Sequence, residues 1–310
     1  MPRSITLGTH AAGSLFHAVG SGLASVLTKN SGMEVVIAPH PGPVAWIDKM
    51  ASGELEMGLA NEAESRWIYD GAEDYKPRGP SPQLRMLRIG HANEVGVMVP
   101  SGSSIQTLAD LRGKKIAWPV SGHASYTLQG RGILAQAGLS ENDIVSVPAE
   151  SFAAAGRLVL EGRAEVVFST TSAAMVKEIS DAKGGVRFIP MKDDAKSVEI
   201  MAKIHPGKIA YLKPGETGVT QPTAAWAFDA YIVAWDKLSD AVAYQVVKTL
   251  SEHYDELAPI HPVLKRWTPE AAISGSFSIP VHSGAIKYYK EKGMWTKEID
   301  ALQKKLLAGK

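Results

Sequence analysis

Ile5-Thr-Leu-Gly-Thr-His-Ala-Ala-Gly-Ser-Leu-Phe-His-Ala-Val-Gly20 has the pattern of a strand, a loop of small residues and a helix. The apolar residues 5–7 predict a buried strand, and apolar residues recur at helical spacing from Ser14 onward. The first turn of a helix carries unpaired N–H groups and the positive end of the dipole, so it attracts carboxylate or phosphate. The alternative is an ordinary strand-to-helix turn of an α/β domain, because glycine-rich turns are weak signals.

The composition limits the class of protein. A chain of 310 residues is long enough for two medium-sized cores. Its formal net charge is +1, and it lacks the basic stripe that nucleic-acid binding requires. The absence of cysteine excludes disulfides and zinc-thiolate sites, and it fits a periplasmic protein. No apolar run approaches the ~18 residues of a membrane span. The N-terminus fits a cytosolic protein, or an exported one whose signal peptide has been removed.

A second strand, small-residue loop and helix are predicted at 115–118, 119–125 and 126–137. Residues 51–60 and 160–169 also match each other, since each has a helix end, a glycine and a glutamate before an apolar strand. We therefore expect one βαβ plan used twice, in two α/β lobes.

The rest of the chain is predicted from local pattern. Two separate strands are expected at 84–89 and 95–99, a loop at 206–222 and a long apolar strand at 224–234. Helices are expected around 241–254, 284–292 and 297–307. This last part has no small-residue loop of its own, so we expect it to pack on the first lobe.

Ligands of open α/β sheets bind beyond the carboxyl ends of strands, where loops lead into helix N-termini. The loops at these places are rich in hydroxyls, amides and histidine, which suit a polar ligand held by neutral donors. His10 and His123 occupy matching loops; each faces a ligand or is a solvated loop histidine. Glu62 begins a helix, where a carboxylate favours the dipole. If Glu62 faces the ligand instead, a ligand with an amine is favoured.

Sequence motifs of common enzymes are absent. The chain has no Gly-x-Ser-x-Gly elbow, no Gly-Lys-Ser/Thr phosphate loop and no His-Glu-x-x-His metal pair. We therefore expect a binding protein without metal or cofactor. One alternative is an enzyme of the same fold that uses His10 or His123 as acid or base. Another is the sensing domain of a regulator, although no DNA-binding or signalling segment accompanies it.

Several stretches together resemble a known family, the solute-binding proteins of tripartite ATP-independent periplasmic (TRAP) transporters of the TAXI class. Residues 5–20 resemble the opening strand, loop and helix of that family. The later landmarks are Gly42-Pro-Val44, Ser52-Gly-Glu-Leu-Glu-Met-Gly-Leu-Ala-Asn61, Ile105-Gln-Thr-Leu-Ala-Asp-Leu-Arg-Gly-Lys-Lys115, Gly184-Gly-Val-Arg-Phe-Ile-Pro190, Phe228-Asp-Ala-Tyr231 and Pro280-Val-His-Ser-Gly-Ala-Ile-Lys-Tyr-Tyr289. Their order and spacing carry the resemblance, which runs nearly end to end.

The resemblance implies an α/β, type II periplasmic-binding-protein fold, with two lobes joined by crossing strands around a ligand cleft. Lobe I would comprise residues 1–92 and 226–310, and lobe II residues 93–225. The protein would be a periplasmic monomer that captures an organic acid and delivers it to TRAP membrane subunits. The expected ligand-binding residues are Thr9, His10, Gly13, Ser14, Leu15, Phe16, Gly42, Pro43, Asn61, Glu62, Ser121, Gly122, His123, Ser125, Thr170, Thr171, Ser172 and Phe228.

The chain departs from the family pattern in two loops and at one aromatic residue. Many members have a longer Gly/Ser/Thr run in place of Thr9-His-Ala-Ala, and a Gly-Ser-Gly-Thr-like loop in place of Ser121-Gly-His-Ala-Ser125. A tyrosine is common at the position of Phe16. With two histidines gained and a hydroxyl lost, the choice stays open among a glutamate-like amino acid, a 2-oxo acid and a dicarboxylate.

Overall fold

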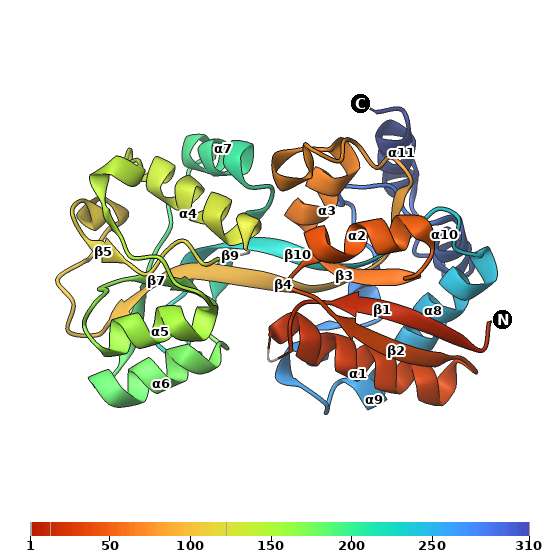
Figure 1. The fold of residues 1–310 in the computed structure, drawn as a ribbon, viewed down its shortest axis with the longest axis horizontal. Helices are drawn as coiled ribbons and strands as arrows, with labels where there is room; N and C mark the ends of the chain where they lie inside the picture. Colours follow the sequence, from red (N-terminus) through yellow and green to blue (C-terminus); the bar gives the residue numbers. More distant parts are fainter. Residues whose placement is uncertain (1, 13, 122, 310) are drawn as a thin grey trace. The chain divides into compact units, whose positions relative to one another are not determined.

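The structure, a computed structural model, describes residues 2–12, 14–121 and 123–309 (Figure 1). The chain divides into two compact units: unit 1 is Met1–Ala92 with Asp229–Lys310, and unit 2 is Asn93–Phe228. Two long strands, β4 (Leu84–Pro100) and β10 (Thr223–Trp235), run through the points of division. The boundary expected after residue 225 also lies within β10.

Unit 1 is built on a mixed sheet. Strand β1 (Ser4–Thr9) pairs in parallel with β2 (Glu34–Pro39) on one side and with β3 (Met57–Asn61) on the other. Strand β10 continues this sheet antiparallel to β3, with Ala230 opposite Asn61. All residues of β3 and β10 are buried, which accounts for their continuous apolar sequences.

Helices cover both faces of the unit 1 sheet (Figure 1). Helix α1 (Leu15–Asn30) packs on β1 and β2, α2 (Pro43–Ser52) on β1 and β3, and α3 (Glu62–Asp70) follows β3. The C-terminal part belongs to the same unit, since α8 (Asp240–Glu252) packs beside α1 and α10 (Ser283–Glu291) packs on α8. Its other elements are α9 (Tyr254–Leu257), α11 (Lys297–Leu307) and the 3₁₀ turns η1 (Glu73–Tyr75), η4 (Pro262–Arg266) and η5 (Glu270–Ala272).

Unit 2 combines parallel and antiparallel pairing. Strands β5 (Lys115–Ile116) and β6 (Val145–Ser146) are parallel. Strands β7 (Val167–Ser169) and β8 (Val186–Ile189) pair antiparallel with β4, and β9 (Lys208–Leu212) pairs antiparallel with β10. The helices are α4 (Ala124–Gln136), α5 (Phe152–Leu160), α6 (Ala174–Lys183) and α7 (Ala195–Ile204), with 3₁₀ turns η2 (Leu108–Leu111) and η3 (Glu141–Asp143).

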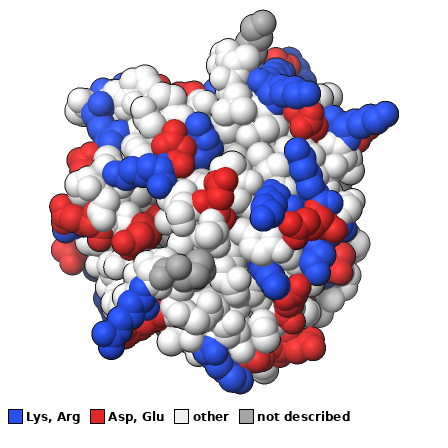
Figure 2. Space-filling model, turned by 90° about the vertical axis from the view of Figure 1, so that its right-hand side faces the viewer, with Lys and Arg blue, Asp and Glu red and all other residues white. Residues whose placement is uncertain are grey.

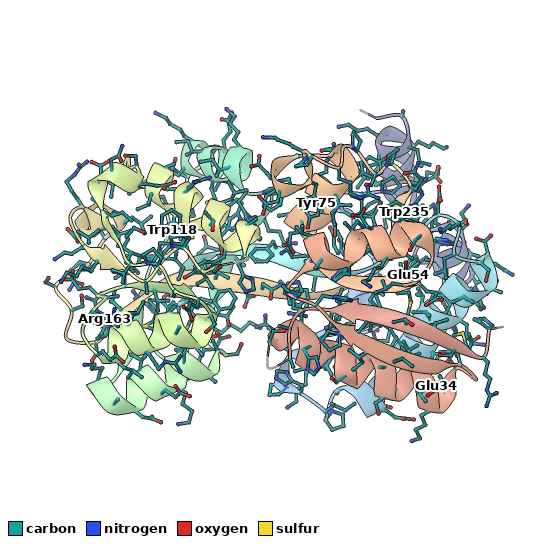
Figure 3. All side chains as sticks on the ribbon, in the orientation of Figure 1. Glu34, Glu54, Tyr75, Trp118, Arg163 and Trp235 are labelled. Atoms are coloured by element: carbon teal, nitrogen blue, oxygen red, sulfur yellow. The ribbon has the colours of Figure 1, made fainter. Side chains whose placement is uncertain are left out.

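Trp118, labelled in Figure 3, packs in the core of unit 2 beneath α4. Its indole N–H donates to the Tyr126 carbonyl oxygen at 3.3 Å. A Cβ added at Gly130 would lie 2.3 Å from the Trp118 Nε1 atom, so this helix position requires glycine. Because Gly130 has no side chain, α4 can approach the Trp118 indole closely at this position.

Some sequence predictions were wrong at the level of single elements. The strands predicted at 84–89 and 95–99 form one strand, because the polar residues between them, such as His91 and Asn93, are buried rather than exposed. The predicted loop at 206–222 contains β9, whose alternating partly exposed residues gave no apolar run. Strand β5 ends at Ile116, before the predicted end at 118, and α4 begins at Ala124, before the predicted start at 126.

On the face of unit 1 that Figure 2 shows, basic and acidic side chains are interspersed, and neither sign forms one continuous patch. This distribution agrees with the near-zero net charge of the sequence. Among the described residues, no helix combines the length and the apolar character that crossing a membrane requires.

Candidate ligand-binding site

The predicted residues of unit 1 gather at one edge of its sheet. Strands β1, β2 and β3 are parallel, with Thr9 opposite Pro39 and Gly8 opposite Gly58, so their carboxyl ends lie side by side. The His40 N–H donates to the Thr9 carbonyl oxygen at 3.1 Å and joins the first two loops. The residues at this edge are Thr9, His10, Ser14, Leu15, Phe16, Gly42, Pro43, Asn61 and Glu62.

Ser14 is the N-cap of α1. Its hydroxyl oxygen accepts from the His17 N–H at 3.1 Å, while its backbone is extended. A serine in this position satisfies one of the unpaired donors of the first turn. The helix therefore begins where the sequence predicted, directly after the loop of small residues. Gly13, predicted to line the ligand site, lies outside the described residues.

His10 is buried, with 8% of its surface exposed, so the solvated-loop alternative is wrong for this histidine. Its ring stacks on Phe16 with centroids 4.5 Å apart and planes within 13°. Phe16 in turn contacts His91, at a centroid distance of 5.9 Å. The His91 Nδ1 accepts from the Trp267 indole N–H at 3.2 Å. His91 and Trp267 therefore pack next to His10 and Phe16. The sequence analysis did not single out either residue.

Asn61 and Glu64 hold each other at the start of α3. The Asn61 Oδ1 accepts from the Glu64 N–H at 2.8 Å, and the Asn61 Nδ2 donates to the Glu64 Oε2 at 2.9 Å. Burial, with a smaller contribution from Asp74, raises the pKa of Glu64 to about 8. Glu64 is therefore mostly protonated at neutral pH. The two hydrogen bonds with buried Glu64 fix the orientation of the Asn61 amide.

Glu62 is the first residue of α3, while Asn61 serves as the cap. The Glu62 Oε2 accepts from the Asp229 N–H at 3.4 Å, and the Ser278 hydroxyl donates to the Glu62 carbonyl oxygen at 3.2 Å. Glu62 is half-buried. The helix dipole stabilises a carboxylate in the first turn, which is the alternative that the sequence offered for Glu62.

Gly42 and Pro43 form the start of α2. Pro43 occupies the first turn, and Gly42 is the N-cap without any side chain to satisfy the first donors of the helix. The backbone at Gly42 is extended, with a φ of 172°, a conformation that any residue adopts. No described atom lies within 4 Å of a Cβ built there. Open space therefore lies beside Gly42, at the start of α2.

The predicted residues of unit 2 also share one edge. Parallel bridges join Ile116 to Val166 and Val120 to Ala149, and the Ser121 N–H donates to the Ala149 carbonyl oxygen at 2.9 Å. These contacts bring together the loops that precede α4, α5 and α6. They carry the predicted residues Ser121, His123, Ser125, Thr170, Thr171 and Ser172. Gly122 lies outside the described residues.

His123 is the N-cap residue of α4, but its side chain does not make the capping hydrogen bond. Its ring lies against Phe152 at a centroid distance of 4.6 Å, and burial lowers the pKa of His123. Phe152 is also in edge contact with Tyr126, at 5.1 Å, and remains 37% exposed. The sequence analysis missed Phe152. Its signal was a bulky aromatic residue at the first helical position, directly after the cap Ser151.

The loop before α6 carries three hydroxyl side chains, Thr170, Thr171 and Ser172, and they make contacts within unit 2. The Thr171 hydroxyl donates to the Glu216 Oε2 at 2.6 Å, and the Thr170 and Ser172 hydroxyl oxygens lie 3.4 Å apart. Helix α6 begins after Ala173, whose methyl side chain cannot cap it. The first turns of α4 and α6 thus both lack a side-chain cap, like that of α2.

Ser125 lies in the first turn of α4, where its hydroxyl is 2.9 Å from the His205 Nε2. The Phe228 ring contacts the same imidazole at a centroid distance of 4.9 Å. The sequence prediction placed Phe228 in lobe I, but the structure places it in unit 2. The expected boundary after residue 225 and the division after Phe228 both lie within β10. His205 was not predicted.

The described residues contain no group of three or more His, Asp or Glu side chains arranged to hold a metal ion. Both edges instead present hydroxyls, an amide, imidazoles and helix N-termini. This arrangement suits a small polar molecule bound by hydrogen bonds.

Solved structures that share this fold include periplasmic binding proteins. The periplasmic aliphatic sulphonate binding protein SsuA from Escherichia coli matches with a TM-score of 0.53 and 16% identity, over 97% of this chain and 91% of that one. PhnD1 from Prochlorococcus marinus, in complex with methylphosphonate, matches with a TM-score of 0.59 and 11% identity, over 95% and 100%. The predicted periplasmic-binding-protein fold is thereby confirmed.

The sequence itself identifies the family. Residues 7–293 match the model of the NMT1-like family, and the chain belongs to that family. A third similar structure is the alkanesulfonate-binding protein SsuA from Xanthomonas axonopodis pv. citri bound to MOPS, with a TM-score of 0.51 and 16% identity over 99% of this chain and 97% of that one. At these identities the similar structures establish the fold. The family and the fold together support the predicted broad class, a solute-binding protein.

Proposed function

We propose that this protein is a periplasmic receptor that captures a small organic anion and delivers it to a membrane transporter. One observation carries the proposal: helices α2, α4 and α6 begin at predicted ligand loops without a side-chain cap. Their first-turn N–H groups are suited to bind an oxyanion, which supplies only acceptors. Membership of the NMT1-like family supports the role of a solute receptor.

The ligand that we propose is an organic acid: a glutamate-like amino acid, a 2-oxo acid or a dicarboxylate. Carboxylate oxygens accept hydrogen bonds from serine and threonine hydroxyls and from backbone N–H groups. The names of the similar structures extend the range, since they bind sulfonate or methylphosphonate. Carboxylate, sulfonate and phosphonate share an oxyanion head, so the same donors suit all three.

The transporter that we propose is of the TRAP type, on the resemblance of the sequence to TAXI-class receptors. One similar structure is described instead as a periplasmic protein of a putative sulfonate ABC transporter, from Methylobacillus flagellatus KT. Uptake by reconstituted membrane subunits separates the two. Transport driven by an ion gradient without ATP supports a TRAP partner, and dependence on ATP contradicts it.

We further propose that the protein is a monomer and not an enzyme. The enzyme alternative assigns acid–base chemistry to His10 or His123, yet the rings of both pack on phenylalanine. A bound compound should therefore be recovered chemically unchanged. Turnover of that compound, lost in His123→Ala while binding remains, would support the enzyme alternative.

The decisive experiment is a thermal-shift screen with L-glutamate, 2-oxoglutarate, succinate, ethanesulfonate and methylphosphonate, with neutral and amine controls. A ligand at a thousandfold excess over its Kd stabilises the native state by about 4 kcal/mol, so a true ligand gives a clear shift. We expect one of the anions to give the shift. A response to the amines alone would contradict the anion site and favour recognition by Glu62.

A further inference from the structure

Four ring side chains form a connected series inside unit 1. The Trp267 indole N–H donates to the His91 Nδ1 at 3.2 Å, and the two ring centroids are 6.1 Å apart. The His91 ring lies 5.9 Å from that of Phe16, which stacks on His10 at 4.5 Å. Centroid distances of about 4.5–7 Å are typical of interacting aromatic pairs. The series thus connects Trp267, in the C-terminal part of the chain, with two predicted ligand-binding residues.

Trp267 is itself held in place from two sides. Its carbonyl oxygen accepts from the Arg88 Nη2 at 2.6 Å, and the Arg88 guanidinium lies over the indole at 5.5 Å from the ring centroid. A Cβ added at Gly90 would lie 2.2 Å from the Trp267 Cζ2 atom, so β4 approaches the indole closely at this glycine. Trp267 is 0% exposed. These contacts fix the position of the indole, and with it the direction of its N–H.

The hydrogen bond from Trp267 selects the orientation of the His91 ring. An indole nitrogen only donates, so the His91 Nδ1 accepts. Turning the imidazole over about its Cβ–Cγ bond would replace Nδ1 by the carbon Cδ2, which does not accept a hydrogen bond. His91 is 1% exposed, so bulk water does not replace the lost bond. The indole N–H therefore favours one of the two orientations of the imidazole against Phe16.

We propose that Trp267 is a positioning residue of the candidate site in unit 1, which fixes the orientation of the His10–Phe16 stack through His91. The stack lies directly after β1 and in the first turn of α1, at the edge where we place the ligand. A stack that is already held at one angle lowers the ordering cost of binding. This inference rests on the proposed function, and it extends the site to a residue outside the predicted ligand loops.

The first test needs no ligand. The ring current of Phe16 shifts the ring protons of His10, so their signals in ¹³C–¹H spectra of the full chain report the geometry of the stack; His10→Gln assigns these signals by their loss. Trp267→Phe keeps an aromatic ring but removes the N–H, and it should move the His10 signals. Trp295→Phe, which removes the indole N–H bond to Asp300 at 3.1 Å, is the matched control and should leave them in place. Unchanged His10 signals in Trp267→Phe would overturn the proposal.

The second test measures the Kd for L-glutamate and for ethanesulfonate by calorimetry. Trp267→Phe should raise the Kd about fivefold, the factor that corresponds to one hydrogen bond, and Trp295→Phe should leave it unchanged. His91→Phe removes the acceptor but keeps a ring beside Phe16, so it should weaken binding to a similar extent. Since the two residues act through one bond, the double variant should bind no more weakly than the weaker single variant. Effects that multiply in the double variant would contradict the positioning role.

The design allows for a variant that does not fold and for a failure of the proposed function. If Trp267→Phe does not fold, His91→Phe decides, because an unchanged Kd there would contradict the proposal. If neither probe nor any other anion of the screen binds, the proposed function fails, while the His10 signals still decide whether Trp267 orients the stack. If a probe binds equally well to the unsubstituted protein and to both single variants, the proposed function stands and the positioning role fails.

Discussion

Replacing Glu64 by glutamine should stabilise the protein, and the gain should grow as the pH rises. Glu64 is buried at the start of α3, where its Oε2 accepts from the Asn61 Nδ2 at 2.9 Å. A glutamine has nearly the same shape and offers its amide oxygen to the same donor. The substitution therefore keeps the hydrogen bond and removes the group that has to ionise.

The magnitude follows from the pKa of Glu64, which burial raises from 4.5 to about 8. The folded state holds the proton to a higher pH than the unfolded state, so stability is lost as the pH rises from 4.5 to about 8. A tenfold change in the ionisation constant corresponds to about 1.4 kcal/mol, so the full difference is about 5 kcal/mol. About 3 kcal/mol of it develops between pH 5 and pH 8.

The assay is urea unfolding followed by tryptophan fluorescence at pH 5, 6, 7 and 8. The free energy of unfolding of Glu64→Gln, minus that of the unsubstituted protein, should increase by about 3 kcal/mol over this range. Glu161→Gln, at the exposed end of α5, is the control and should show no such increase. Parallel pH profiles for Glu64→Gln and the unsubstituted protein would refute the reasoning.

Three substitutions test the candidate site itself. Gly42→Leu fills the open space before α2 and should abolish ligand binding at an unchanged melting temperature, whereas Gly102→Leu, in an exposed turn with equal space, should affect neither. Phe152→Ala should weaken the affinity measured by calorimetry about three- to tenfold, with little loss of stability, because the ring is partly exposed. Ser14→Leu should abolish binding and cost about 1 kcal/mol of stability through the lost N-cap, measured by urea unfolding; an unchanged affinity would show that this edge of unit 1 is not the site.

The sequence predicted best where the signal is local. Ser14 precedes a helical apolar pattern and caps α1, and the helix predicted at 297–307 has those bounds in the structure. Their caps and periodicity lie within a single segment of chain. The alternation of strand, loop and helix also predicted the α/β class, whereas the periplasmic-binding-protein fold was implied by the family resemblance.

The parts that the sequence did not predict depend on partners distant in the chain. Strand β4 continues through His91 and Asn93 because Trp267 donates to His91 and because the Asn93 amide reaches the Phe228 carbonyl oxygen at 3.5 Å. His205 contacts Ser125 and Trp226, which lie on other elements of unit 2. No property of the residues next to His205 carries that information.

The proposed receptor has to bind an anion and still release it, and each edge, taken by itself, has a feature that fits this need. In unit 1 Glu64, which is hydrogen-bonded to the Asn61 amide, is mostly protonated, and in unit 2 burial keeps His205, beside Ser125, neutral, so neither group adds a charge of its own. The predicted ligand-binding residues include no lysine or arginine, and the favourable field comes from helix N-termini, each equivalent to about half an elementary charge. Partial charges and neutral donors attract an oxyanion through many hydrogen bonds of modest strength rather than through one ion pair. Because these bonds can break one at a time as the ligand leaves, the arrangement fits a receptor that has to give up its ligand to a transporter.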